Sequence, residues 1–234
     1  LEDHLIISIS EHAYLTVAKG PLSIPKGKMD FSGHCLIIPI EHIPKLNPKE
    51  HNHRDILETP TGKDVLNFER SIAEMNDKKY DMATIVFEIN SEHSIHFHKQ
   101  IVPVPKYLMN NFESALDRQV HFNNDRYTNN ARLNFVEFSD ANNEEYLKLI
   151  NNCENNYIQF TVYESSGSTP KKYITTFESR ERIDLQFGRR VVAYILRLPK
   201  RTKWDSKPCQ QTIEQEKRDV EKFQKGFKEY DFTN

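Results

Sequence analysis

The segment from His96 to Gln100 carries the residue types best suited to chemistry in this chain. In a β-strand, alternate side chains share one face at a spacing of about 7 Å, so His96, His98 and Gln100 are predicted to lie together. Imidazoles and an amide can donate hydrogen bonds to phosphate oxygens, and a neutral imidazole can attack phosphorus. The ordinary histidine pKa of about 6.5 suits both tasks. The segment therefore predicts a phosphate or nucleotide site, although two half-buried sheet histidines are the structural alternative.

Short strands and two helices must position this segment. Apolar and β-branched runs predict strands over residues 5–10, 13–18, 35–40, 82–89 and 95–102. Helical spacing predicts helices from Thr59 to about Asn76 and around Leu108 to Leu116. Strands this close in sequence favour an antiparallel sheet with helices on one side.

The second half is richer in asparagine and predicts further elements. A short strand over 135–138, a hairpin of 157–164 with 173–178 and a helix stripe over 185–198 are expected. Thr212 and Gln215 form a capping box that predicts the start of the last helix.

Composition excludes several function classes. The chain has 234 residues with 32 basic and 34 acidic side chains, so its net charge of −2 gives no global attraction to nucleic acid or membrane. The positions of its seven glycines exclude both the dinucleotide fingerprint and the P-loop. No apolar run is long enough for a membrane helix, and three cysteines without a CxxC motif favour a reducing compartment. The first residue is Leu, so a longer parent chain is expected.

One segment of the second half is strongly basic. Residues 180–207 contain nine basic and three acidic side chains, a local net charge of +6. This concentration is typical of phosphate-backbone contact, and Trp204 is suited to stacking on an unpaired base. The candidate RNA-binding residues are Arg189, Arg190, Arg197, Lys200, Arg201, Lys203 and Trp204. Lys171 and Lys172 are weaker candidates, and a solvated helix face with a buried Trp is the alternative.

Several motifs together resemble a known family. They are the strand Leu5–Ile9, the run Gly33–His42, the run from His96 to Pro105, Phe187-Gly188-Arg189-Arg190, Leu198-Pro199-Lys200-Arg201 with Trp204, and Glu216-Lys217-Arg218-Asp219. They resemble the C-terminal region of the CwfJ family, whose first module is similar to the histidine-triad (HIT) fold, and above all its fungal members that associate with the lariat debranching enzyme. The resemblance implies late spliceosome components and branched or lariat RNA as partners, and a nuclear location, with the cytoplasm as a second compartment.

The resemblance assigns roles to individual residues. His98 matches the histidine nucleophile, His96 flanks it, and Gln100 stands where hydrolases carry a third histidine, as in the nucleotidyltransferase branch. His34, His42 and Asn90 match pocket positions of the fold.

The turn before the histidine segment departs from the family pattern. The sequence Asn90-Ser91-Glu92-His93 lacks the usual glycine and adds a carboxylate. A negative charge opposes phosphate binding, so this departure favours a pocket that binds over one that catalyses. A zinc site of His93, His96 and His98 is the metal alternative, but His93 has the opposite strand parity. His51 and His53 are expected to be exposed, and no metal or cofactor is expected.

The sequence thus predicts an α+β protein with a HIT-like antiparallel domain over residues 1–120 and a smaller α+β C-terminal domain over residues 121–234. The predicted function is binding of branched or lariat RNA and of splicing partners, which promotes debranching and intron turnover. Two alternatives stay open: a HIT-type nucleotidyl hydrolase or transferase that uses His98, and a protein-interaction module with a vestigial pocket.

Overall fold

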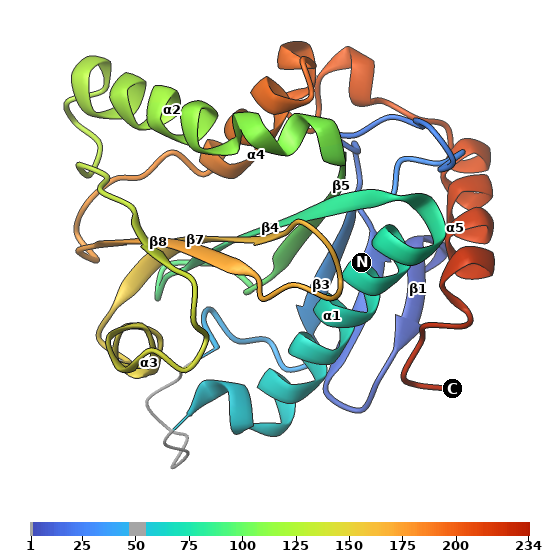
Figure 1. Cartoon of the computed structure of the whole chain (residues 1–234), viewed down its shortest axis with the longest axis horizontal. Helices are drawn as coiled ribbons and strands as arrows, with labels where there is room; N and C mark the ends of the chain where they lie inside the picture. Colours follow the sequence, from blue (N-terminus) through green and yellow to red (C-terminus); the bar gives the residue numbers. More distant parts are fainter. Residues whose placement is uncertain (1, 47–54) are drawn as a thin grey trace.

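One antiparallel sheet runs through both halves of the chain (Figure 1). The computed structural model describes residues 2–46 and 55–234. The eight strands lie in the order β1-β2-β3-β5-β4-β7-β8-β6. Their bounds are β1 Ile6–Ile9, β2 Ala13–Val17, β3 Cys35–Pro39, β4 Met82–Asn90, β5 Lys99–Pro105, β6 Val136–Phe138, β7 Asn156–Tyr163 and β8 Lys171–Phe177. The predicted α+β class with an antiparallel sheet is confirmed.

Five α-helices and five short 3-10 helices complete the described fold. The α-helices are α1 Pro60–Tyr80, α2 Phe112–Arg126, α3 Glu144–Asn151, α4 Phe187–Ile195 and α5 Ile213–Phe227. The 3-10 helices are η1 Asp3–Leu5, η2 Ile56–Glu58, η3 Lys106–Asn111, η4 Pro199–Arg201 and η5 Lys207–Cys209. No helix among the described residues is long and apolar enough to cross a membrane.

Helices cover both faces of the sheet (Figure 1). One core lies on the side of α1, α3 and α5, and a second lies on the side of α2 and α4. The prediction that helices cover one side was therefore wrong. The central strands show the reason, because every residue of β7 and almost every residue of β4 is buried, which requires apolar cover on both faces.

Two local predictions of the second half are confirmed. The β7–β8 hairpin forms between the two predicted strands. Thr212 accepts the N–H of Gln215, and the Gln215 side chain accepts the N–H of Thr212, so α5 begins with the predicted capping box.

The strand that carries the histidine segment begins later than the sequence predicts. β5 starts at Lys99, four residues after the predicted start at residue 95, and Ile95 is 87% exposed. The backbone N–H of Phe97 donates to the carbonyl of Ile43 at 2.8 Å. It therefore takes no part in the hydrogen bonds that pair β3 with β5, which begin at Lys99. His96 and His98 consequently lie in an irregular segment immediately before the strand.

The halves of the chain meet at β4 and β7. These strands pair from Thr84 to Asn90, so hydrogen bonds of the sheet join segments on either side of the predicted domain boundary. The boundary at residue 120 falls inside α2. The division into domains 1–120 and 121–234 stays a prediction.

Candidate nucleotide and RNA site

A cavity of about 690 Å³ brings the two predicted features together. From the first half, His96, His98 and Gln100 line it, and from the second half, Arg189 and Trp204 do so. The remaining wall is largely apolar: it includes Leu36, Phe87, Ile89, Ile158, Phe177, Ile183 and Leu185. The volume lies within the range of small-molecule sites, and a largely apolar wall that also carries polar groups suits a base with its phosphate. We call it the histidine cavity.

His98 presents an unprotonated nitrogen to this cavity. Its Nδ1 lies 3.2 Å from the carbonyl oxygen of His96, and because a carbonyl only accepts, Nδ1 carries the proton. Nε2 of the neutral ring then holds a lone pair. The protein atoms around the ring partly desolvate it and so lower the pKa of His98 below its ordinary value. This arrangement lets His98 accept a proton or attack phosphorus. The His98 side chain is exposed, so a substrate can reach it.

His96 is oriented by the neighbouring strand. Its Nε2–H donates to the carbonyl of Pro39 at 2.9 Å. Its ring lies 4.4 Å from the ring of His42, centroid to centroid. His42 is exposed and is not among the described residues that line the cavity. His42 therefore supports His96 from outside.

His34 is a buried positioning residue. The N–H of Leu22 donates to its Nδ1 at 2.9 Å, so the ring proton is on Nε2, and Nε2 donates to Oε1 of Gln100 at 3.0 Å. Because Oε1 is engaged there, the NH₂ group of Gln100 is left to donate to a ligand in the cavity. Complete burial, aided by the positive charge of Arg189, lowers the pKa of His34 to about 3 and keeps the ring neutral.

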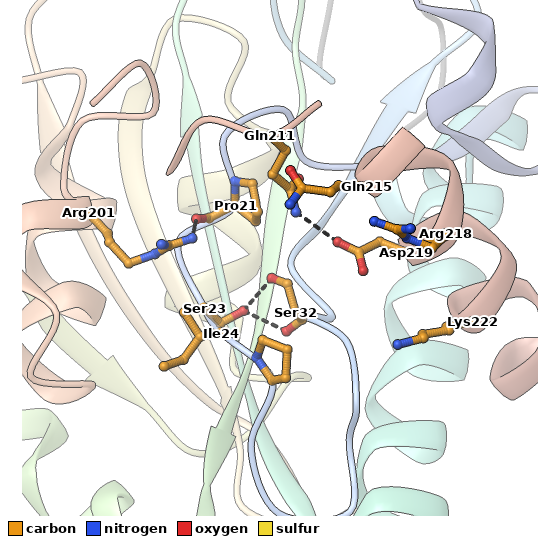
Figure 2. A pocket seen from close by; sticks show the side chains of 11 residues that line it. Pro21, Ser23, Ile24, Ser32, Arg201, Gln211, Gln215, Arg218, Asp219 and Lys222 are labelled. Carbon is orange, nitrogen blue, oxygen red and sulfur yellow. Dashed lines mark hydrogen bonds between the residues drawn. The ribbon is translucent and has the colours of Figure 1, made fainter. Parts of the chain in front are cut away.

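Two arginines of the predicted RNA-binding segment hold the loop that precedes His34. Arg201 donates from Nε to the carbonyl of Leu22 at 2.9 Å and from Nη2 to that of Pro21 at 2.6 Å, and the second contact is drawn in Figure 2. Arg189, only 4% exposed, donates from Nη2 to the carbonyl of Gly20 at 3.0 Å. We call these contacts the arginine clamp. The clamp fixes the loop whose Leu22 N–H sets the tautomer of His34.

Trp204 lies beside this clamp at the cavity wall. It is 50% exposed, and its backbone packs against Gly20 so closely that a Cβ there would lie 1.9 Å from the Trp204 carbonyl oxygen. Gly20 also has a φ of +62°, which favours glycine. The close approach holds the indole at the wall of the cavity with one side open to solvent.

The other predicted RNA-binding residues lie outside the cavity lining. Arg190 pairs with Asp184 at 3.0 Å. Arg197, Lys200 and Lys203 are exposed, and within the described residues none of them forms an ion pair. These three cations flank Trp204 in sequence and are available to a phosphate backbone.

Asn90 and the turn that follows it are placed differently from the family pattern. Asn90 is buried, and its Oδ1 accepts the N–H of Leu46 at 3.1 Å, which ties down a loop. Glu92 accepts a hydrogen bond from the hydroxyl of Ser179, which also lies 2.8 Å from Nε2 of His93. Among the described residues, Ser179 and His93 line the cavity and Asn90 and Glu92 do not. The carboxylate that was expected to oppose phosphate thus points to Ser179.

The three clustered histidines do not assemble a metal site in the described part of the chain. The one set of ligand atoms that lie within 4.8 Å of one another comprises Glu2, His4 and Glu216. The ammonium group of Lys19 already bonds to both of these carboxylates. His51 and His53 lie outside the described residues.

Sequence reasoning missed Ser179 and the apolar wall. Phe87, Ile158 and Phe177 come from three strands, and no local pattern distinguishes these cavity residues from ordinary core residues. The sequence also offered no reason to select Gly188 for this site. A Cβ at this position would lie 2.2 Å from the Phe87 ring, so the lack of a side chain lets α4 approach β4.

The fold and this cavity define an α+β protein with a histidine-lined pocket on an antiparallel sheet. The family description "Protein similar to CwfJ C-terminal" matches residues 1–119, and "Protein similar to CwfJ C-terminus 2" matches residues 87–233. The chain belongs to the CwfJ family, also called CWF19-like.

Curated relatives agree with this assignment. The chain is 57% identical to CWF19-like protein DRN1 of Saccharomyces cerevisiae over 100% of this chain and 45% of that protein. It is 33% identical to CWF19-like protein mug161 of Schizosaccharomyces pombe over 98% of this chain and 36% of that protein. Identity to human CWF19-like protein 1 is 27% over 100% of this chain and 37% of that protein. The chain thus spans less than half the length of these relatives.

Proposed function

We propose that this chain binds a nucleotide of branched or lariat RNA in the histidine cavity and thereby assists intron turnover. The observation that carries the proposal is the convergence of His96, His98 and Gln100 with Arg189 and Trp204 around one apolar-walled cavity. Family membership supports a splicing context, with late spliceosome components and the lariat debranching enzyme as partners and the nucleus as location.

The cavity lining offers groups for both the phosphate and the base of a nucleotide. Gln100 offers its NH₂ group to a phosphate oxygen, and the apolar wall with Trp204 offers a surface for a base. Exposed Lys200 and Lys203 add affinity for the neighbouring phosphates because they attract a polyanion without fixed partners of their own in the described chain.

The test compares branched and linear RNA of equal length across a salt series. Trp204→Ala is expected to cost about 1–3 kcal/mol of binding free energy through lost stacking. The double variant Lys200→Ala/Lys203→Ala is expected to reduce the slope of log K against log salt by about 1.4, since each single-strand phosphate contact contributes about 0.7. Lys63→Ala, an exposed cation on α1 across the sheet, is the matched control. Salt-independent affinity in the wild type would refute the proposal.

His98 supports a second candidate function, a nucleotidyl hydrolase or transferase. With the proton on Nδ1, the Nε2 lone pair can attack the α-phosphorus of a nucleotide substrate, forming an N–P bond as the bond to the leaving group breaks. Water or an acceptor hydroxyl then attacks the same phosphorus, loses its proton and releases Nε2. The NH₂ group of Gln100 would stabilise the charge on a phosphoryl oxygen, whereas the Nε2–H of His96 is already donated to the Pro39 carbonyl.

This candidate predicts release of nucleoside monophosphate that disappears in His98→Ala. His121→Ala, which changes an exposed histidine on α2, is the control and should keep full product formation. Equal product from the wild type and His98→Ala would assign the release to a contaminant and eliminate the enzymatic candidate, while the RNA-binding proposal is judged separately by the salt series.

A further inference from the structure

A second cavity lies on the opposite side of the sheet from the histidine cavity. It measures about 620 Å³ and is bordered by α1, α3 and the strands β4, β5, β7 and β8. Phe87 packs in the core beside α4, whereas its neighbour Glu88 interacts with groups on the α1 side. We call this second space the α1-side cavity. Its interior is polar, with Glu88, Lys99, Gln159 and Lys172 in the lining.

Two charged side chains at its floor have unused hydrogen-bonding capacity. Glu88 is 5% exposed, and its Oε2 has no hydrogen-bond partner within the described residues, while Oε1 accepts from Gln159. Lys172, a weaker RNA-binding candidate from the sequence, is only 8% exposed. Its Nζ donates to the Thr161 hydroxyl at 3.2 Å and lies 5.6 Å from the centroid of the Tyr146 ring. An ammonium has three donors, so two remain.

The charge balance of the floor limits what can occupy it. Lys99 bonds to Glu69 at 2.8 Å and lies 3.7 Å from Glu88, so with Lys172 the group contains two buried ammonium groups and two buried carboxylates. A charged guest would unbalance this neutral set in a medium of low dielectric, at a large electrostatic cost. A hydroxyl is neutral, can donate to Glu88 and can accept from Lys172, so it matches both open positions.

The mouth has a different character. Arg70 lines the cavity and is exposed, and its guanidinium forms no hydrogen bond or ion pair within residues 2–46 and 55–234. Lys78, also in the lining, is already paired with Glu74 at 2.6 Å. Arg70 therefore offers a free, planar cation that suits a phosphate. Tyr157, 1% exposed, adds an aromatic wall.

We propose that the α1-side cavity binds a small phosphorylated polyol, such as a ribose phosphate, with its hydroxyl groups on Glu88 and Lys172 and its phosphate on Arg70. The volume lies in the range of small-molecule sites. A free sugar phosphate and the terminal nucleotide of an RNA share this chemistry. The sheet lies between this site and the histidine cavity, and of the described residues Glu88 lines both cavities.

Calorimetric titration of the whole chain with ribose 5-phosphate tests the proposal. Arg70→Ala is expected to weaken binding about tenfold, the effect of one charge-assisted contact, and to leave the weaker binding of ribose alone unchanged. Lys172→Met is expected to weaken both ligands, after a thermal melt has shown that the variant folds. Lys63→Ala, an exposed α1 cation that does not line the cavity, is the control for Arg70→Ala.

Three results would overturn the proposal. They are absence of ribose 5-phosphate binding at millimolar concentration, equal affinity in Arg70→Ala and the wild type, and loss of binding in Trp204→Ala, which would place the ligand in the histidine cavity. Competition assigns the source of the ligand: displacement by a short oligoribonucleotide with a terminal phosphate supports an RNA end, and no displacement supports a free sugar phosphate. RNA binding can fail in the salt series while this titration succeeds, so the two proposals are separable.

Discussion

His34 should make the stability of this protein depend on pH in a measurable way. Its pKa is about 3 in the folded chain, because the ring is completely buried beside cationic Arg189, and about 6.5 once the chain unfolds. Between these values the unfolded chain binds a proton that the folded chain does not. Stability is therefore retained above pH 6.5 and is lost as the pH falls. Integrated from pH 7 to pH 5, the contribution of this one histidine is a loss of about 2 kcal/mol in the free energy of unfolding.

Urea denaturation of the wild type and of His34→Gln at pH 7, 6 and 5 isolates this contribution. Glutamine cannot titrate, so the variant is expected to lose about 2 kcal/mol less than the wild type over this range, whatever its stability at pH 7. His121→Gln, which changes an exposed histidine on α2, is the control and should retain the wild-type pH dependence. Parallel pH curves for the wild type and His34→Gln would refute the buried, neutral assignment of His34. An NMR signal of the His34 ring that moves between pH 7 and 5 would refute it independently.

Three further substitutions test the contacts that hold the fold around the two cavities. Lys99→Met should lower the free energy of unfolding by about 3–5 kcal/mol in a urea titration, because it leaves buried Glu69 without its counter-ion. Gly20→Ala should cost at least about 1 kcal/mol and weaken RNA binding, because a Cβ there meets the Trp204 carbonyl and φ is positive; Gly167→Ala, where a Cβ meets nothing within 4 Å, is its matched control. Thr212→Ala should lower the free energy of unfolding by about 1 kcal/mol in a thermal melt, since it removes the capping box of α5. An unchanged melting temperature would show that the cap is dispensable.

The sequence could predict what depends on local spacing. Strand and helix patterns identified most of the elements, and His96, His98 and Gln100 line one cavity although only Gln100 belongs to β5. The prediction of a regular strand through both histidines was wrong because a long-range bond, from the Phe97 N–H to the Ile43 carbonyl, competes with the sheet ladder. Local propensity contains no information about that partner.

Residue type did not reveal which charges are available to a ligand. Arg189 and Arg201 lie in the basic segment whose composition is typical of phosphate contact. Much of their hydrogen-bond donor capacity is nevertheless used by the backbone carbonyls of the clamp. Lys172, a weaker RNA-binding candidate from the sequence, is buried and lines the α1-side cavity. A guanidinium binds a carbonyl and a phosphate through the same donors, so only the tertiary partner separates a structural arginine from a binding one.

The arginine clamp also joins the two matched family segments, residues 1–119 and 87–233, by direct contacts. Arg201, from the second segment, fixes the Pro21–Leu22 backbone, Leu22 sets the tautomer of His34, and His34 turns the Gln100 amide toward the cavity. A chain cut at residue 120 would lose this clamp. It would also lose β7, so that the buried strand β4 would present an open edge to solvent. The chemistry-bearing residues before residue 120 thus depend on the chain after residue 120, both for their orientation and for the cover of the sheet that holds them.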